Sequence, residues 1–180
     1  MTDEISYPRL ADYREPKEFY DRGRGRAWQA AWLLVQSLFF SSWWFPRRLR
    51  PVVLRAFGAT IGHGVVIRHR VRVQWPWKLV VGEDSWIGEE CWLYNAGDIT
   101  IGSDVCLSQG VYVCAGDHDR TAKDFHPRGR PVVVEDGAWL ATQCMILGDV
   151  TIGTGAVVGA RAIVNHDVKP GGNVRTGTVN

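Results

Sequence analysis

The sequence lacks any pair of cysteines at the spacing of a metal site or of a redox motif. It holds four cysteines, which are Cys91, Cys106, Cys114 and Cys144. None forms a C-x-x-C pair, and none stands at zinc-site spacing from a histidine. A cleavable signal peptide is also missing, because the first 20 residues are polar and charged. These absences predict reduced thiols, a cytoplasmic location and no bound metal.

A strong imbalance of charge is missing as well. The formal net charge is +2, with ten Arg and Lys against six Asp and Glu in residues 1–57 and eleven against thirteen in the remainder. This excess is too small to indicate a nucleic-acid partner, although a basic, aromatic N-terminal part is compatible with an anionic membrane surface. A hydrophobic content of 46% with 22% charged residues is typical of a folded chain.

A repeat of six residues runs through most of the chain. Aliphatic residues recur at this interval at the following positions: Ile61, Ile67, Val73; Val81, Ile87, Leu93; Ile101, Leu107, Val113; and Val134, Leu140, Ile146, Ile152, Val158, Val164. A small or β-branched residue stands four positions after each member of the last series. A period of six fits neither an α-helix nor a simple alternating strand, so each unit is predicted to be a short strand followed by a corner.

Three such units return the chain to a position above its start and stack parallel strands about 4.8 Å apart. The sequence therefore predicts an all-β protein, a parallel β-helix of about five coils between residues 59 and 168. Cys91 and Cys144 fall at the small inward position and are expected in the core. Residues 1–57 are expected to form a helical, amphipathic extension, and residues 58–180 the β-helix domain. The spacing leaves the handedness open, although the general crossover rule favours right-handed connections.

The segment 27–45, "AWQAAWLLVQSLFFSSWWF", is nearly all apolar and is flanked by arginines. Its polar residues Gln29, Gln36 and Ser37 fall near one helical line and leave a wide apolar face. Three alternatives remain open: a helix that covers the solenoid or a subunit contact, a helix lying in a membrane interface, and a membrane span. Arginines on both sides weigh against a span, and tryptophans at both ends favour an interfacial helix. Pro46 is predicted to end the helix.

The hexad count fails between Val113 and about Val132, where a charged loop, residues 115–131, is expected to leave the coil. Loops that project from a rigid repeat scaffold are where function concentrates. His118 stands just after the last strand before the loop, so the coil anchors its backbone, whereas His126 lies in the middle of the loop. The alternative for either histidine is a solvated side chain or a turn contact.

These motifs resemble those of the hexapeptide-repeat O-acetyltransferases, the group that contains maltose, galactoside and nodulation-factor acetyltransferases. The resemblance is carried by the [LIV]-G-x-x-[small]-x hexads and by "VYVCAGDHD", which matches the extended loop with its histidine. The runs "RAFGATIGHGVVIR", "PWKLVVGEDSWIGEECWLYNAG" and "VVVEDGAWLATQCMILGDVTIG" are similar to the colanic acid biosynthesis acetyltransferases in particular. The resemblance implies a left-handed β-helix, a homotrimer with active sites between subunits, and acetyl-CoA as cosubstrate.

His118 matches the catalytic position of that family, and a neutral imidazole is a suitable base for a sugar hydroxyl near pH 7. A carboxylate or carbonyl is expected to fix its tautomer, with Asp117, Asp119 and the Asn95 backbone as candidates; the two aspartates are also expected to contact substrate. Asn95 in "LYNAG" matches a family position beside the catalytic histidine, which implies that it contacts substrate or orients the imidazole in catalysis. Its alternative is a corner residue with positive φ.

The resemblance also implies how the cosubstrate is held. The backbone N–H of Thr142, from the neighbouring subunit, corresponds to the donor for the oxyanion. Trp139, Ala141 and Ala160 match positions that line the pantetheine arm, and Trp139 could equally pack between subunits. Six residues are thus predicted to bind the cofactor: Trp139, Ala141, Thr142, Ala160, Asn165 and His166. The last two depart from the Thr-Lys usual in the family, and Arg161, Lys169 and Arg175 are candidates to compensate.

Two other functions remain as alternatives. A carbonic anhydrase-like enzyme would need three histidines from two subunits, and His63, His69, His118 and His126 are poorly arranged for this. In a non-catalytic, membrane-associated scaffold, His118 would have no catalytic role. The favoured function is O-acetylation of a sugar in exopolysaccharide biosynthesis by direct transfer, on a sugar or a lipid-linked oligosaccharide, in the cytoplasm or at the inner face of the membrane, with no nucleic acid.

Overall fold

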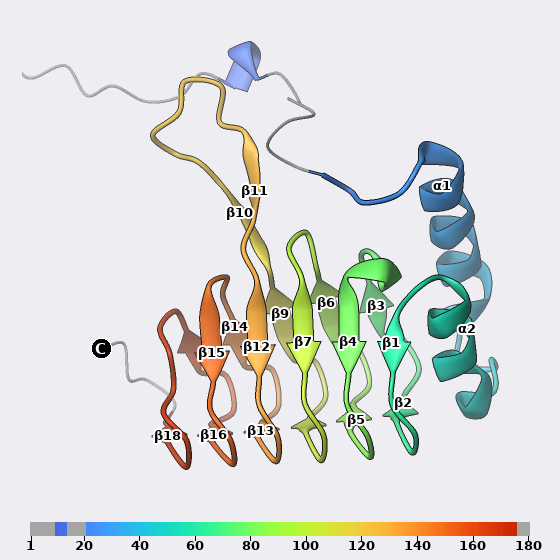
Figure 1. Ribbon diagram of the computed structural model, residues 1–180, viewed down its shortest axis with the longest axis vertical. Helices are drawn as coiled ribbons and strands as arrows, with labels where there is room; N and C mark the ends of the chain where they lie inside the picture. Colours follow the sequence, from blue (N-terminus) through green and yellow to red (C-terminus); the bar gives the residue numbers. More distant parts are fainter. Residues whose placement is uncertain (1–9, 14–20, 176–180) are drawn as a thin grey trace, which may run out of the picture.

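The computed structural model describes residues 10–13 and 21–175, and most of them form one solenoid of three parallel sheets (Figure 1). The first sheet contains β1 (Thr60–Ile61), β4 (Leu79–Val81), β7 (Ile99–Ile101), β12 (Val132–Val134) and β15 (Val150–Ile152). The second contains β2 (Val66–Ile67), β5 (Trp86–Ile87), β8 (Cys106–Leu107), β13 (Trp139–Leu140), β16 (Val157–Val158) and β18 (Asn173–Val174). The third contains β3 (Arg72–Val73), β6 (Trp92–Tyr94), β9 (Tyr112–Cys114), β14 (Met145–Ile146) and β17 (Ile163–Val164).

The chain passes from the first sheet to the second and the third in every coil. Five complete coils result, and β18 begins a sixth. As the chain advances from the β1 end to the β18 end it turns from the front to the bottom to the rear of the view, which makes the helix left-handed (Figure 1). The predicted left-handed parallel β-helix is confirmed.

The hexad aliphatic residues form the core of the prism. All six members of the last series, from Val134 to Val164, have side chains with no exposed surface. The register stacks equal hexad positions, since Leu140 pairs with Leu107 on one side and with Val158 on the other. Cys91 and Cys144 are fully buried as predicted. Burial raises the pKa of both thiols to about 12, so they are packing residues rather than nucleophiles.

Glycine is required where one corner meets the next. A Cβ atom on Gly82 would lie 2.5 Å from the carbonyl carbon of Gly102 in the following coil. At another corner the chain needs a left-handed backbone, which Asp84 and Asp104 adopt with φ of 54° and 57°. Glycine and aspartate thus stand at corners where the coils approach closely or the backbone is left-handed.

The N-terminal helices close the first end of the solenoid (Figure 1). They are α1 (Arg26–Val35), the π-helical η2 (Gln36–Phe40), η3 (Arg47–Leu49) and α2 (Arg50–Ala56), while η1 (Leu10–Asp12) and η4 (Pro76–Lys78) are single turns elsewhere. Trp32, Phe40 and Leu54 are fully buried against the first coil. Among the residues that the structure describes, no helix combines the length and the apolar character needed to cross a bilayer.

The same helices satisfy the free edge of the third sheet. Trp32 Nε1 donates to the carbonyl of Val73 at 2.9 Å, and Gln36 Oε1 accepts from the Val73 N–H at 2.7 Å. An unpaired strand edge invites pairing with another chain, and a covering helix prevents this. Of the alternatives for residues 27–45, the structure therefore shows a helix that covers the solenoid.

Candidate active site

The break in the repeat at residues 115–131 leaves the coil, and part of it forms an antiparallel hairpin that the sequence did not predict. Its strands are β10 (Gly116–His118) and β11 (Pro127–Gly129), which leave the solenoid between β9 and β12 (Figure 1). Asp117 lies opposite Arg128, and His118 lies opposite Pro127. A Cβ on Gly97 would lie 2.6 Å from the backbone nitrogen of Arg130, so the preceding corner fits tightly under the hairpin base. The hairpin gives His118 a fixed position on an ordered arm.

His118 is exposed, and its ring is held by Phe125. Nδ1 lies 2.7 Å from the carbonyl oxygen of Phe125, and the two rings stack with centroids 4.6 Å apart at 11°. Because a carbonyl only accepts, Nδ1 must carry the proton, and Nε2 keeps its lone pair. Phe125 has φ of 47°, an unusual conformation for a bulky residue. The geometry therefore leaves Nε2 available to take a proton.

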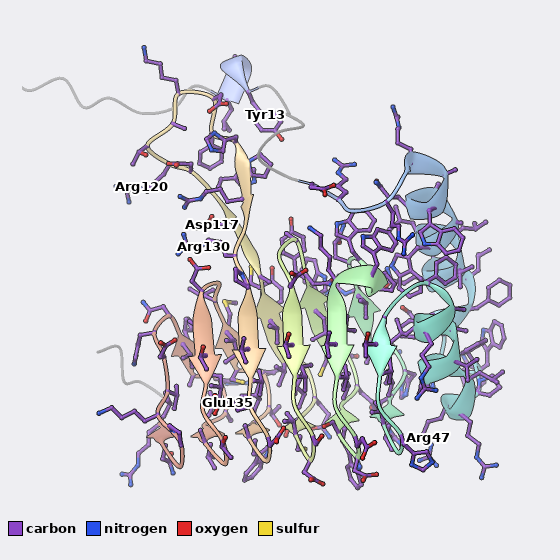
Figure 2. The ribbon with its side chains drawn as sticks, viewed as in Figure 1. Tyr13, Arg47, Asp117, Arg120, Arg130 and Glu135 are labelled. Atoms are coloured by element: carbon purple, nitrogen blue, oxygen red, sulfur yellow. The ribbon has the colours of Figure 1, made fainter. Side chains whose placement is uncertain are left out.

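This contact corrects the expected partner of the imidazole. The expected partners were Asp117, Asp119 and the Asn95 backbone, whereas in the structure the ring contacts the Phe125 carbonyl. No sequence signal pointed to Phe125, because a backbone oxygen is available at every position. The ring of Tyr13 also approaches His118, with centroids 6.4 Å apart, and Figure 2 shows Tyr13 beside the hairpin.

Asp117 and Asp119 stabilise the hairpin through Arg128. Asp117 accepts two hydrogen bonds from this guanidinium at 3.0 Å each and lies 3.6 Å from Arg130, with which it meets at the hairpin base (Figure 2). Asp119 lies 3.4 Å from Arg128 and accepts from the backbone N–H and the hydroxyl of Thr121 at 2.8 and 2.6 Å. The contacts within the described chain are structural, and a substrate contact stays a prediction.

The Thr121 hydroxyl and N–H hold the pKa of Asp119 low, at about 2. Since the ordinary value is near 3.9, this carboxylate favours the folded turn above about pH 4, and its contribution is lost as the pH falls through about 2. We expect the Thr121 amide resonance to titrate with a midpoint near 2 and to lose this titration in Asp119→Asn, as followed by NMR between pH 1.5 and 6. A midpoint near 3.9 in the wild type would contradict the contact.

Asn95 occupies a position that neither prediction described. Its side chain is fully buried, its Oδ1 accepts from the Trp75 N–H at 2.9 Å, and its Nδ2 donates to the Trp75 carbonyl. It is not among the residues with positive φ. Its neighbours Tyr94 and Ala96, and not Asn95, line the 60 Å³ cavity beside His118. The amide thus joins two coils, and the geometry within the chain gives it no contact with the imidazole.

The residues predicted to hold the cofactor lie on two edges of the prism. Trp139 is half exposed on β13 and donates from Nε1 to the Ser108 hydroxyl at 2.9 Å. Ala141, Thr142 and Ala160 follow at corners between the second and third sheets. The Thr142 hydroxyl reaches Gln109 at 3.4 Å, and its carbonyl accepts from the Arg161 N–H.

Asn165 and His166 lie elsewhere, on the edge between the third and first sheets from which the His118 hairpin also leaves. His166 Nδ1 lies 3.0 Å from Asn165 Oδ1, and both residues are exposed. One chain therefore does not unite His118 with Thr142. In the part of the chain that the structure describes, no three His, Cys, Asp or Glu residues gather as potential metal ligands.

Comparison with known proteins gives consistent matches. The family described as bacterial transferase hexapeptide (six repeats) matches residues 131–166. A protein of Escherichia coli described as a colanic acid biosynthesis acetyltransferase, WcaF, is 41% identical over 158 residues, which cover 86% of this chain and 85% of WcaF.

Two solved structures share the fold. The hexapeptide-repeat acetyltransferase VCA0836 of Vibrio cholerae, complexed with acetyl-CoA, gives a TM-score of 0.74 at 22% identity over 83% of this chain and 81% of that one. A galactoside acetyltransferase in complex with coenzyme A gives a TM-score of 0.75 at 18% identity over 83% of this chain and 76% of that one.

Proposed function

The chain belongs to the bacterial hexapeptide-repeat acetyltransferases, and we propose that it transfers an acetyl group from acetyl-CoA to a sugar hydroxyl in the assembly of a colanic acid-like exopolysaccharide. The family supplies the reaction class, and the name of the E. coli relative supplies the pathway. One observation carries the assignment to a residue: His118 is exposed on an ordered hairpin with Nδ1 directed at the Phe125 carbonyl.

In the proposed reaction His118 Nε2 takes the proton of the acceptor hydroxyl as its oxygen attacks the thioester carbonyl. The new C–O bond forms, and negative charge collects on the former carbonyl oxygen, where a backbone N–H at Thr142 would donate to it. The C–S bond then breaks, and the imidazolium returns its proton to the departing sulfur. No covalent enzyme intermediate is needed, which agrees with the burial of Cys91 and Cys144.

The distribution of these residues supports a site between subunits, and the resemblance to the family supplies the homotrimer. His118 extends from one edge of the prism, whereas Thr142 and Ala160 lie on another. A second copy that placed its Thr142 edge against the first copy's hairpin would complete the site. Trp139 would then border the arm of the cosubstrate, and small residues at Ala141 and Ala160 would leave room for it.

The nucleotide end of acetyl-CoA would be held by a different set from the usual Thr-Lys. Asn165 and His166 offer hydrogen bonds but no permanent charge. Arg161 is exposed, and its Nε donates to Gln143 Oε1 at 3.0 Å. Arg161 and Lys169 are the cations nearest in sequence to Asn165 and His166, and we propose that they bind the phosphates of acetyl-CoA.

The test is release of coenzyme A from acetyl-CoA, measured as free thiol across a panel of sugar nucleotides and lipid-linked glycans. We expect release that depends on one acceptor, with one acetyl ester formed per thiol. The two rival functions have their own readouts: bound metal with CO₂ hydration for the anhydrase-like enzyme, and binding without turnover for the scaffold. Either result, with no acceptor giving release, would overturn the proposal.

A further inference from the structure

Gln29 of helix α1 and Gln36 of the π-helical η2 are turned toward the protein, whereas Ser37 is exposed and donates to the Leu33 carbonyl. Gln29 is buried and donates to the Arg24 carbonyl, and Gln36 bonds the edge strand at Val73. Trp32 and Phe40 share this inner side. An ordinary surface helix keeps most of its large apolar residues inside, whereas most of those in α1 and η2 are exposed.

Nine large apolar side chains of residues 26–56 are exposed, and five of these lie between residues 34 and 44. We call these five the cap ledge; they are Leu34, Leu38, Phe39, Trp43 and Trp44, exposed by 60, 52, 43, 78 and 53%. Trp44 meets Phe39 edge to face, with ring centroids 5.9 Å apart. None of the five side chains belongs to the buried core, and exposed apolar surface of this kind marks an interaction site.

Arginines border the ledge. Trp43 and Arg47 line one cavity of 190 Å³, together with Phe45, Arg50, Arg68 and His69. Arg47 also lines a neighbouring cavity of 490 Å³ with Arg48, Arg55 and His63, and no Asp or Glu lines it. In residues 10–13 and 21–175, Arg47 and Arg48 form no ion pair with a carboxylate. Figure 2 shows Arg47 at the lower corner of the capped end.

We propose that the cap ledge and the arginine-lined cavity together dock on a bilayer that contains anionic lipids. Trp43 and Trp44 would enter the interface between headgroups and acyl chains, the usual place of exposed tryptophan in membrane proteins. Arg47 and Arg48 would bind lipid phosphates, which a guanidinium contacts with two parallel hydrogen bonds.

Charge complementarity selects this occupant. A second copy placed ledge to ledge would bring arginines against arginines, which costs free energy at close range. An anionic bilayer offers acyl chains next to phosphates, which matches the apolar cap ledge next to its arginines.

This inference rests on the proposed function and deepens it, because docking on a membrane would present a lipid-linked acceptor to the active site. His118 belongs to the third coil, two coils beyond the first, or about 10 Å. The cap adds roughly one helix diameter, also about 10 Å. The imidazole would thus stand some 20 Å above the ledge, at the level of a glycan and clear of the acyl chains.

The test is sedimentation of the full chain with vesicles of phosphatidylcholine alone or mixed equally with phosphatidylglycerol. We expect binding to the mixed vesicles that falls roughly 30-fold in the pair Arg47→Gln, Arg48→Gln, at about fivefold per charge. The pair Trp43→Ala, Trp44→Ala should lose roughly tenfold or more, because binding scales with buried apolar area.

Matched controls remove the same groups elsewhere. Arg120→Gln with Lys123→Gln neutralises two exposed cations of the hairpin, and Trp139→Ala removes a half-exposed tryptophan of the solenoid. Both should sediment as the wild type does, and circular dichroism should show every variant folded.

Three outcomes would overturn the docking proposal: equal binding to neutral vesicles, binding insensitive to the two cap pairs, or a change of oligomeric mass in the cap variants, which would make the ledge a contact between copies. Thiol release on a soluble acceptor separates this failure from failure of the proposed function. If no vesicle binding occurs but the cap variants still release thiol on a soluble acceptor, only the docking proposal fails and the proposed reaction stands.

Discussion

Replacing His118 by alanine should lower kcat for acetyl transfer by about 100- to 10,000-fold, the usual contribution of a general base. The expected loss is this large because Nε2 is the nitrogen that Phe125 leaves unprotonated, and the variant has no other group at that position to take the hydroxyl proton. The rate is measured as thiol release at saturating acetyl-CoA. KM for acetyl-CoA should change little, since the imidazole would act on the acceptor hydroxyl.

Two further variants make this result specific. His118→Asn keeps a donor for the Phe125 carbonyl but removes the base, so it should be as inactive as alanine while preserving the hairpin. His126→Gln removes the other histidine of the hairpin, whose Nδ1 lies 2.9 Å from Asp124, and should retain activity close to that of the wild type. An active His118→Asn would mean that His118 only orders the hairpin.

The sequence predicted the solenoid well because its information is local and repeated. Leu140 and Ile146 are buried because every coil presents the same side-chain period to the same axis, so fifteen aliphatic positions test one hypothesis together. The handedness was not contained in that period. It came from the resemblance alone, since the general crossover rule pointed the other way.

The hairpin and the site were predicted less completely, for physical reasons. The pairing of Asp117 with Arg128 depends on the register of the hairpin strands, and residues 116–129 show no alternation of polar and apolar residues that would predict it. The contact from His118 goes to a backbone carbonyl, aimed by a positive φ that Phe125 rarely adopts. The Asn95 contact was within reach, because the coil period places Trp75 directly beneath it.

The cap was ambiguous because the line of Gln29, Gln36 and Ser37 was compatible with all three alternatives for the segment. Gln29 and Gln36 satisfy backbone groups of Arg24 and Val73. A glutamine that forms a hydrogen bond with a strand edge and one that faces water look alike in a sequence.

Replacing Trp32 by alanine should lower the free energy of unfolding by about 3–5 kcal/mol, the range for removing a large buried aromatic side chain. Trp32 has no exposed surface, contacts Phe40 and Phe57 with ring centroids 5.4 and 5.2 Å away, and donates to the Val73 carbonyl. The variant would leave a cavity under the cap and an unsatisfied carbonyl on the edge strand. Equilibrium unfolding in urea measures the loss, and hydrogen exchange should show β1 to β3 losing protection first, because each coil is stabilised by its neighbours.

Trp43→Ala is the matched control, since this tryptophan of the same segment is 78% exposed and its removal should change stability by no more than about 0.5 kcal/mol. Trp32→Phe separates the two parts of the Trp32 effect, because it keeps most of the ring and loses the hydrogen bond, worth about 1 kcal/mol. Equal destabilisation by Trp32→Ala and Trp43→Ala would place both rings in the core and remove the cap ledge with them. The expected contrast, one ring needed for folding and the other only for binding vesicles, would establish that the cap has an inner side that closes the solenoid and an outer side left for a partner.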